Sequence, residues 1–240
     1  MNFLCIEQKK QNPEGEMSLS DPYVLTHLDE VLGKKEGDSI KVKMLGHGVG
    51  EASIRKMASS EVILKLERLK EIHDSRNVTL AVGACRPLMA KRILEHGTTL
   101  GVKNFIFFKS YLSESSYLDS KVFKPGNIKK YTLKGLSQTE KYINLPEVLI
   151  TKSLQEICLE PFEQKLFLHG PGENYLSPKT SMDKNLIVFI GGERGWHESE
   201  LQYFKDKEIT EVAISESILR VEFAMQAFMA QAEWVKNARF

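Results

Sequence analysis

Strand-like and helix-like segments alternate from residue 78 to the end of the chain, and this alternation constrains the fold most strongly. Apolar runs predict strands in "VTLAVGA", "VKNFIFF", "KLFLH", "NLIVFI" and "TEVAI". Between the first two, "RPLMAKRILEHGTTLG" predicts a helix with Pro87 in its first turn and Gly101 at its C-terminal end. Such alternation predicts a mostly parallel sheet covered by helices on both faces.

Two further helices are expected near the C-terminus, in "WHESELQYFKD" and "SILRVEFAMQAFMAQAEW". The second carries an apolar stripe made of Ile218, Val221, Met225, Phe228 and Met229. No internal repeat interrupts this pattern.

The first 69 residues have a different texture, with short apolar runs that glycines and turn residues interrupt. Alternation in Ser39 to Val42 and in Val62 to Leu69 predicts a small antiparallel β-domain. Its "GHGVG" stretch has no following helix and is typical of a hairpin turn. The polar run "EIHDSRN", residues 71–77, is the expected boundary. We therefore expect two domains, residues 1–72 and residues 73–240.

The stretch "NLIVFIGGERGW", residues 185–196, predicts a buried strand that runs into a glycine-rich loop and then a helix. In parallel sheets, ligands bind beyond the carboxyl ends of the strands. Backbone N–H groups at a helix start attract anions, but "GGERG" matches neither GxGxxG nor the P-loop pattern. The loop is therefore either a tight turn or part of a binding site.

A second strand–loop–helix junction lies in "AISESILRVEFA", residues 213–224. It places Arg220 and Glu222 at the start of a long helix, either as functional groups or as solvated residues. The six histidines show no metal-ligand spacing, so no metal site is expected.

The formal net charge of +1 means that only a local patch could argue for nucleic-acid binding. One candidate is residues 120–139, which hold five lysines and no acidic residue, with Tyr111, Tyr117, Phe123 and Tyr131 interleaved nearby. Lysines neutralise phosphates and aromatic rings stack on unpaired bases. A lysine-rich solvated helix is an equally good interpretation.

Three dispersed cysteines, without CxxC spacing, indicate neither a disulfide framework nor a zinc site and fit a reducing cytoplasm. The sequence shows no signal-peptide pattern and no apolar run of the roughly 20 residues that a membrane span needs. We therefore expect a cytoplasmic protein without a membrane partner.

The order of these segments resembles the RsmE family, SPOUT-superfamily methyltransferases that act on N3 of a uridine in small-subunit ribosomal RNA. "HLDEVLGKKEGDSIKV" and "GHGVGEASI" are similar to the family's N-terminal domain, and "RPLMAKRILEHGTTLGVKNFIFF" to its helix–"LGV"–strand segment. "LSQTEKYINLPEV" is similar to its glutamine-to-proline stretch. "IGGERGW" stands where the family carries "GPEGGF", and "ISESILRVEFA" where it carries "LGxRILRxETA".

The resemblance implies a PUA-like β-barrel domain followed by a SPOUT-type α/β domain, whose parallel sheet has a deep trefoil knot, an exception to the rule that folds are unknotted. It implies a homodimer that binds S-adenosylmethionine in its knotted loops and acts on small-subunit ribosomal RNA or the assembled small subunit. The cofactor-binding residues that it implies are Leu168, His169, Gly170, Ile190, Gly191, Gly192, Glu193, Gly195, Ile214, Ser215, Ser217, Ile218 and Leu219.

The resemblance also implies roles in catalysis and RNA binding. Arg220 is expected to stabilise negative charge on the uracil oxygens, and Glu222 to orient Arg220 or to assist proton removal. RNA is expected to contact the lysines of the β-domain and of the lysine-rich stretch: Lys34, Lys35, Lys121, Lys124, Lys129, Lys130 and Lys134.

Several loop positions depart from the family pattern. Gly192 replaces a proline, Arg194 and Ser215 replace glycines, Ser217 replaces an arginine and Phe223 replaces a threonine. An alternative is therefore a SPOUT-like protein that binds RNA with weakened or lost cofactor binding, or a SPOUT methyltransferase with a different RNA target. A nucleotide-dependent α/β protein that holds phosphate in "GGERG" is a further alternative.

Overall fold

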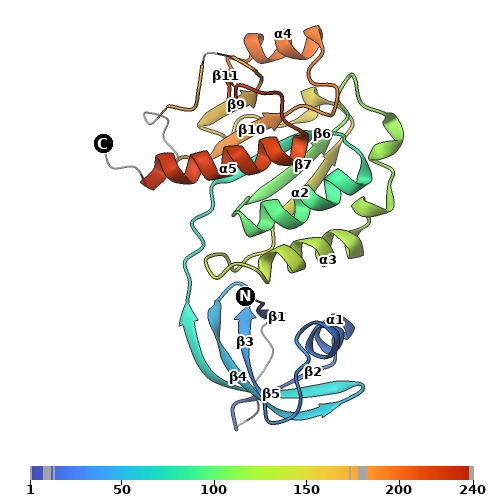
Figure 1. The fold of residues 1–240 in the computed structure, drawn as a ribbon, viewed down its shortest axis with the longest axis vertical. Coiled ribbons are helices and arrows are strands. Elements are labelled where there is room, and N and C mark those ends of the chain that lie inside the picture. The colour runs from blue at the N-terminus through green and yellow to red at the C-terminus, as the bar shows by residue number, and fades with distance from the viewer. Residues whose placement is uncertain (1, 8–11, 13, 173, 178–182, 238–240) are drawn as a thin grey trace. The chain divides into compact units, whose positions relative to one another are not determined.

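The computed structural model describes the chain except residues 1, 8–11, 13, 173, 178–182 and 238–240. It divides into two compact units, each of which is described by itself (Figure 1). The first unit is Met1–Ser75 with Leu133–Leu145, and the second is Arg76–Thr132 with Pro146–Phe240. The first unit thus ends close to the polar run at residues 71–77 and also takes in a later segment of the chain.

That later segment is fixed by a buried lysine of the first unit. Lys43 is fully buried, and its Nζ donates hydrogen bonds to three backbone carbonyls, those of Leu136 (2.8 Å), Thr139 and Tyr142 (both 2.5 Å). A buried ammonium needs such acceptors, because an unpaired charge is strongly unfavourable away from water. No local pattern in the sequence signals this long-range pairing.

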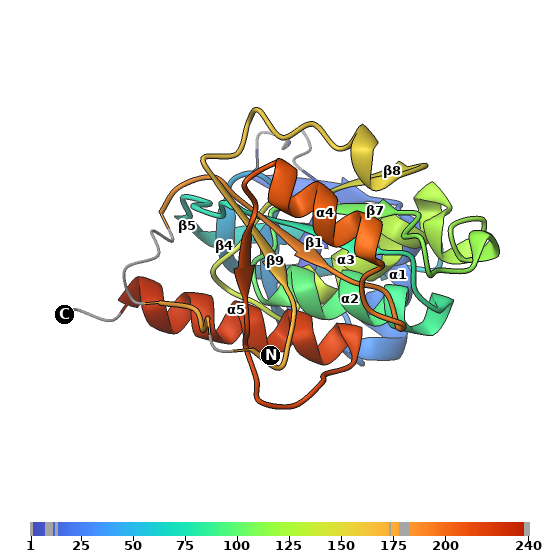
Figure 2. The same ribbon diagram turned by 90° about the horizontal axis from the view of Figure 1, so that it is seen from above.

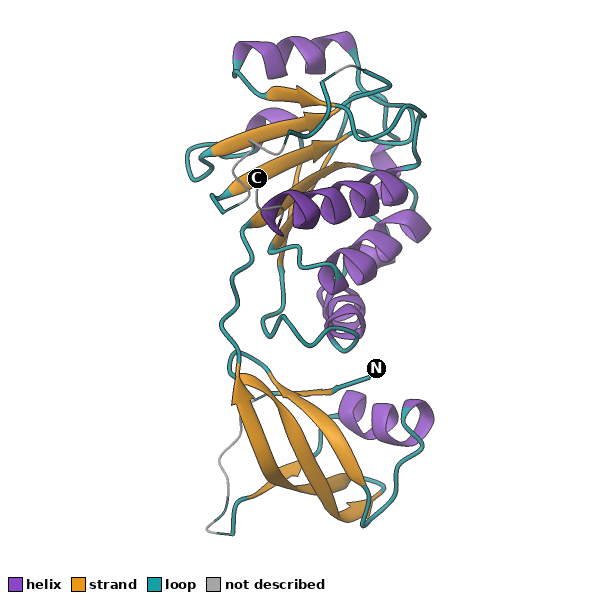
Figure 3. Cartoon of the chain, turned by 60° about the vertical axis from the view of Figure 1, so that its left-hand side comes forward, coloured by secondary structure: helices purple, strands orange, loops and turns teal. Residues whose placement is uncertain are grey.

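The first unit is built on a five-stranded sheet in the order β1-β3-β4-β5-β2. Its strands are β1 (Leu4–Ile6), β2 (Glu16–Leu19), β3 (Ser39–Met44), β4 (Gly48–Ala58) and β5 (Glu61–Glu71). The short helix α1 (Pro22–Thr26) continues into a π-helical turn (His27–Val31). The expected antiparallel pattern holds for all pairs except β1–β3, which is parallel, so the sheet is mixed. Register shifts between β4 and β5 accompany the curl of this sheet (Figure 3).

The glycines of "GHGVG" divide into a turn residue and two strand residues. Gly46 lies in the β3–β4 turn with a φ of +78°, which confirms the predicted hairpin. Gly48 and Gly50 lie within β4, where an added Cβ would overlap the backbone carbonyls of Lys70 and Arg68. Their role is to let β5 approach closely.

The second unit contains a six-stranded, wholly parallel sheet in the order β11-β9-β10-β6-β7-β8. Its strands are β6 (Val78–Gly83), β7 (Asn104–Phe108), β8 (Glu147–Thr151), β9 (Gln164–Leu168), β10 (Leu186–Ile190) and β11 (Thr210–Val212). The five strands predicted from apolar runs are therefore confirmed. The edge strand β8 was not predicted, and its apolar side chains are largely exposed, Leu149 by 56%.

Helices cover both faces of this sheet, as predicted (Figure 2). They include α2 (Pro87–Thr99), α4 (Glu198–Asp206) and α5 (Val221–Asn237). Helix α3 (Pro125–Leu136) begins in this unit, and its residues from Leu133 onward belong to the first unit. Successive strand residues point to opposite faces. Val188 thus belongs to the core that contains Ile93 of α2 and Phe228 of α5, whereas its neighbour Phe189 belongs to the core that contains Phe204 of α4. Burial of each such side chain contributes about 1.5–3 kcal/mol.

The predicted ends of α2 are confirmed, whereas α5 begins later than predicted. In α2, Pro87 occupies the first turn and Gly101, with a φ of +92°, follows the C-terminal end. Helix α5 begins only at Val221, so Ile218 is not part of its apolar stripe and is 84% exposed; the other four predicted stripe residues are buried. The reason is that residues 215–220 form a loop whose hydrogen bonds are local. No helix in the described parts of the chain is long and apolar enough to cross a membrane.

Candidate functional site

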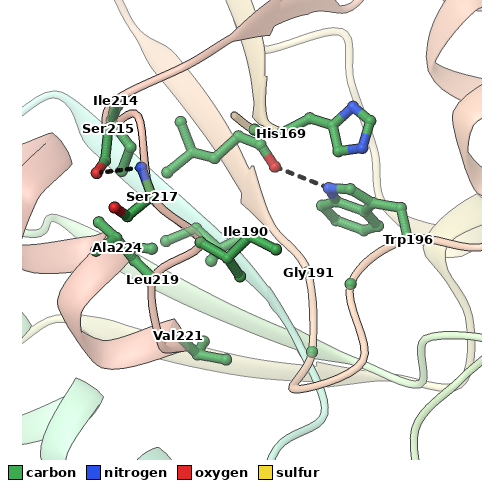
Figure 4. A pocket seen from close by; sticks show the side chains of 15 residues that line it. His169, Ile190, Gly191, Trp196, Ile214, Ser215, Ser217, Leu219, Val221 and Ala224 are labelled. Carbon is green, nitrogen blue, oxygen red and sulfur yellow. Dashed lines mark hydrogen bonds between the residues drawn. The ribbon is translucent and has the colours of Figure 1, made fainter. Parts of the chain in front are cut away.

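A cavity opens at the carboxyl edge of the second unit's sheet, where the loops that follow β9, β10 and β11 come together (Figure 4). It encloses about 120 Å³ and is open to solvent on one side. All but one of the expected cofactor residues line it: Leu168, His169, Gly170, Ile190, Gly191, Gly192, Gly195, Ile214, Ser215, Ser217, Ile218 and Leu219. The exception is Glu193, which lines a neighbouring pocket.

Sequence reasoning missed three residues of this cavity, namely Trp196, Val221 and Ala224. The indole Nε1 of Trp196 donates a hydrogen bond to the carbonyl of Leu168 at 2.8 Å, which ties the loop after β10 to the end of β9 (Figure 4). Val221 and Ala224 are one helical turn apart at the start of α5. The sequence shows that Val221 and Ala224 lie on one face of the helix, but it does not show that this face is turned toward the cavity.

The "GGERG" loop is a tight turn that also forms a wall of the cavity. The N–H of Gly195 donates to the carbonyl of Gly192 at 3.0 Å, and Gly195 has a φ of +73°. The turn lies close to β6, because a Cβ added at Gly83 would be 2.7 Å from the nitrogen of Gly192. The loop is therefore a tight turn and, at the same time, part of the cavity wall.

Glu193 points from the same turn toward the start of α2. Its Oε1 accepts a hydrogen bond from the backbone N–H of Arg86 at 3.3 Å, and its Oε2 lies 3.4 Å from Nε of Arg86. A side-chain hydrogen bond with Tyr117, followed by the charge of Glu193, raises the pKa of Arg86. Arg86 is therefore held between the glycine turn and the segment after β7.

A buried carboxylate behind this turn joins the segment after β7 to the start of α4. Glu200 is only 4% exposed and accepts hydrogen bonds from Ser110 Oγ (3.2 Å), from the N–H of Tyr111 (3.1 Å) and from the N–H of His197 (2.9 Å). The last bond is part of a capping box at the start of α4. Glu200 thereby fixes the segment after β7 relative to the helix that follows the glycine turn.

The second junction is held more loosely. Ser215 Oγ accepts a hydrogen bond from the N–H of Ser217 at 3.0 Å, and Gln231 of α5 donates to the carbonyl of Ile214 at 2.8 Å. The side chain of Ile218 is 84% exposed. Much of this wall of the cavity is therefore accessible to solvent.

The two expected catalytic residues occupy different environments. Arg220 is exposed and stands between Leu219 and Val221, both of which line the cavity. Glu222 is 2% exposed, and its Oε1 lies 3.4 Å from Nη1 of Arg92 in α2. Within the described residues, the ion-pair partner of Glu222 is thus Arg92 rather than Arg220, and its Oε2 is buried without a hydrogen bond.

The expected RNA-binding lysines lie at the surface of their own units. Lys34 is half-buried and the others are exposed: Lys35, Lys121, Lys124, Lys129, Lys130 and Lys134. Of the interleaved aromatic residues, Phe123 belongs to the core and packs edge-on against Phe107 at 4.8 Å, so it is not available for base stacking. Tyr111 is 67% exposed and stacks on His197 at 3.7 Å. In the described parts of the chain, no group of three or more His, Cys, Asp or Glu side chains is arranged to hold a metal.

This chain and its fold are similar to those of known RNA methyltransferases. The family model described as "RNA methyltransferase domain" matches residues 51–233. The chain is 32% identical over 202 residues to ribosomal RNA small subunit methyltransferase E 1 of Borreliella burgdorferi, covering 82% of this chain and 84% of that protein. It is 28% identical over 216 residues to ribosomal RNA small subunit methyltransferase E of Treponema pallidum, covering 85% and 80%. The chain belongs to the RsmE family of RNA methyltransferases.

Solved structures confirm the architecture. Ribosomal RNA small subunit methyltransferase E from Neisseria gonorrhoeae, solved with S-adenosyl methionine bound, has a TM-score of 0.78 at 19% identity and covers 97% of this chain and 98% of its own. A Legionella pneumophila methyltransferase solved with SAM has a TM-score of 0.79 at 16% identity, with 98% of each chain covered. The predicted α/β SPOUT-type sheet and the PUA-like first domain are thereby confirmed, and the threading of the knot stays a prediction.

Proposed function

We propose that this protein is an S-adenosylmethionine-dependent methyltransferase that modifies N3 of a uridine in small-subunit ribosomal RNA. The observation that carries the proposal is the cavity, because residues expected to bind the cofactor, drawn from three separate loops, line it together. The names of the two relatives support the RNA substrate, and the cofactor found in the two solved neighbours supports S-adenosylmethionine.

The residues present fit this cofactor. The walls are glycine backbone and apolar side chains such as Ile190 and Leu219, which suit a nucleoside. A side chain at Gly192 would stand 3.1 Å from the carbonyl of Ala84, so this position keeps backbone groups at the cavity wall. Backbone groups of Leu168, Ile190 and Leu219 would hold the adenosine part. No lysine or arginine is among the residues that line the cavity, which suits a positive sulfonium.

When bound, the cofactor supplies an electrophilic methyl group on a sulfonium sulfur. The nucleophile is N3 of uracil, which must lose its proton as it forms the new N–C bond, while the electrons of the broken C–S bond stay on sulfur. The protein must therefore position N3 in line with that bond and stabilise negative charge on the uracil oxygens. Exposed Arg220, at the rim of the cavity, is our candidate for stabilising this charge.

Glu222 is assigned a positioning role in this proposal. Its ion pair with Arg92 joins the first turn of α5 to α2, and this turn follows directly on Arg220. Because the Glu222 side chain is 2% exposed and that of Arg92 is 44% exposed, removal of Arg92 would leave a buried carboxylate uncompensated, which is strongly unfavourable. The ion pair therefore fixes the backbone position of Arg220, two residues before Glu222.

RNA binding is assigned to the first domain, residues 1–72, and to the surface lysines named above, with the methyltransferase domain in residues 73–240. The proposal includes a homodimer that works in the cytoplasm on ribosomal RNA or the assembled small subunit. Exposed Phe223 (50%) and Trp234 (59%) on α5 provide apolar surface for a second copy of the chain.

The decisive experiment combines calorimetry with mass spectrometry of ribosomal RNA. We expect S-adenosylmethionine to bind at micromolar concentration or below, and a strain without this gene to lack one N3-methyluridine in its small-subunit RNA. RNA binding without cofactor binding would instead support the RNA-binding alternative. An Arg220→Ala variant with full activity and normal cofactor affinity would contradict the role given to Arg220.

A further inference from the structure

A second pocket shares the glycine turn with the cofactor cavity. Gly192 and Gly195 line both spaces. The other walls of the pocket come from Ala84 and Arg86, which follow β6, and from residues 110–117, which follow β7. Both spaces therefore open at the carboxyl edge of the same sheet, and the backbone of one turn borders each of them.

The two spaces differ in chemistry. Glycines and apolar side chains dominate the cavity, whereas ionic and hydroxyl groups dominate the pocket: Arg86, Ser113, Glu114, Tyr117, Glu193 and Arg194. Guanidinium groups recognise phosphate through paired hydrogen bonds. Hydroxyls and carboxylates match the donors and acceptors at the edge of a base. This combination fits a nucleotide better than it fits an apolar ligand.

The pocket is also preformed. Glu193 holds Arg86 through both its oxygens, at 3.3 and 3.4 Å, while the Arg86 side chain remains 72% exposed. The opposite wall is fixed by Glu200, whose carboxylate holds buried Ser110. Groups that are ordered before binding lose less conformational freedom when a ligand arrives.

We propose that this pocket receives the target nucleotide of the RNA, an inference that rests on the proposed function and locates its substrate. Arg86 and Arg194 contact the phosphate, and Tyr117 and Ser113 contact the edge of the base. The nucleotide must leave its stack to enter, as enzymes that modify bases require. From this pocket the base meets the methyl group at the glycine turn that the two spaces share.

The test is steady-state methylation of small-subunit particles from the strain without this gene, using Arg86→Gln and Arg194→Gln. The matched control is Lys103→Gln, which removes one positive charge at the amino edge of the sheet, directly before β7. We expect KM for the particles to rise about tenfold or more for Arg86→Gln and about threefold for Arg194→Gln. The Kd for S-adenosylmethionine, measured by calorimetry, should change less than about twofold in all three variants.

Two results would overturn the assignment: both arginine variants behaving like Lys103→Gln, or a cofactor Kd that weakens in parallel with KM. Because Arg86→Gln also removes an ion pair, each variant is compared with the wild type by thermal unfolding. Tyr117→Phe serves as a second variant that retains the ring, and it should raise KM while leaving the cofactor Kd unchanged. If the wild type methylates no ribosomal RNA, the proposed function itself has failed, which is a separate outcome.

Discussion

Residues 190–196 and residues 213–221 form two walls of one cavity, and they are held in different ways. The first loop is fixed by long-range contacts: Trp196 bonds to Leu168, Glu193 to Arg86, and the turn packs on Gly83. The second has one bond from another element, Gln231 of α5 to the carbonyl of Ile214, together with a local Ser217–Ser215 bond and a largely exposed Ile218. We infer that the first loop is preorganised and that ligand binding orders the second.

The largest expected effect comes from Gly83→Ala, which tests whether close packing on β6 fixes the first loop. The new methyl group would stand 2.7 Å from the backbone nitrogen of Gly192, so the turn must move. We expect a loss of about 1–3 kcal/mol in the free energy of unfolding, with cofactor affinity weakened about tenfold or more. Denaturant unfolding and calorimetry measure the two quantities.

Gly126→Ala is the control for this substitution, because an added Cβ there has no neighbour within 4 Å. It should leave both quantities close to the wild-type values. If Gly83→Ala bound the cofactor as tightly as this control, close packing on β6 would not be what positions the loop.

Trp196→Phe should have the next largest effect, since it retains an aromatic ring and removes the indole N–H. The carbonyl of Leu168 then loses its 2.8 Å hydrogen bond. We expect a stability loss of about 1–2 kcal/mol and a cofactor Kd about three- to tenfold higher. Wild-type stability in Trp196→Phe would show that the hydrogen bond does not hold the loop.

The sequence predicted those parts of the molecule that local patterns specify. Apolar runs identified five parallel strands, and the order of segments brought residues such as Gly170, Ile190 and Leu219 into one cavity. It did not predict that Glu193 turns away toward Arg86, because these residues are 107 positions apart. Glu222 finds Arg92 across 130 positions for the same reason. Side-chain pairing between distant elements depends on tertiary geometry, which periodicity does not encode.

Cys85 offers a pH-dependent measure of how firmly the core at the end of β6 is packed. Burial, followed by the charges of Glu193 and Glu222, raises the pKa of this thiol from 9.0 to about 12. The native state therefore retains its proton between these values while the unfolded state loses it, so stability falls as pH rises above 9. At pH 10 the loss due to Cys85 should be about 1 kcal/mol.

Unfolding experiments at pH 8 and pH 10 on the wild type and on Cys85→Ala isolate this contribution. The variant should lose less stability across the interval, although buried Cys5, with a pKa also raised to about 12, leaves part of the pH dependence in place. Exposed Cys158 allows a direct comparison, because iodoacetamide should modify it at pH 8 while Cys85 stays protected. Rapid modification of Cys85 would mean that the core around the end of β6 opens readily.

The smallest effect is expected for Ser215→Ala, which removes the Oγ that accepts the N–H of Ser217 at 3.0 Å. Because this contact joins residues two positions apart in a partly exposed loop, stability should change by less than about 0.5 kcal/mol. The cofactor Kd should change less than about threefold, since a loop that is ordered by the ligand does not depend on one local bond. Calorimetric measurement of the cofactor Kd for Ser215→Ala and for Trp196→Phe tests which of the two loops affects affinity more. A larger loss of affinity in Ser215→Ala than in Trp196→Phe would mean that the second loop, and not the first, is the preorganised wall.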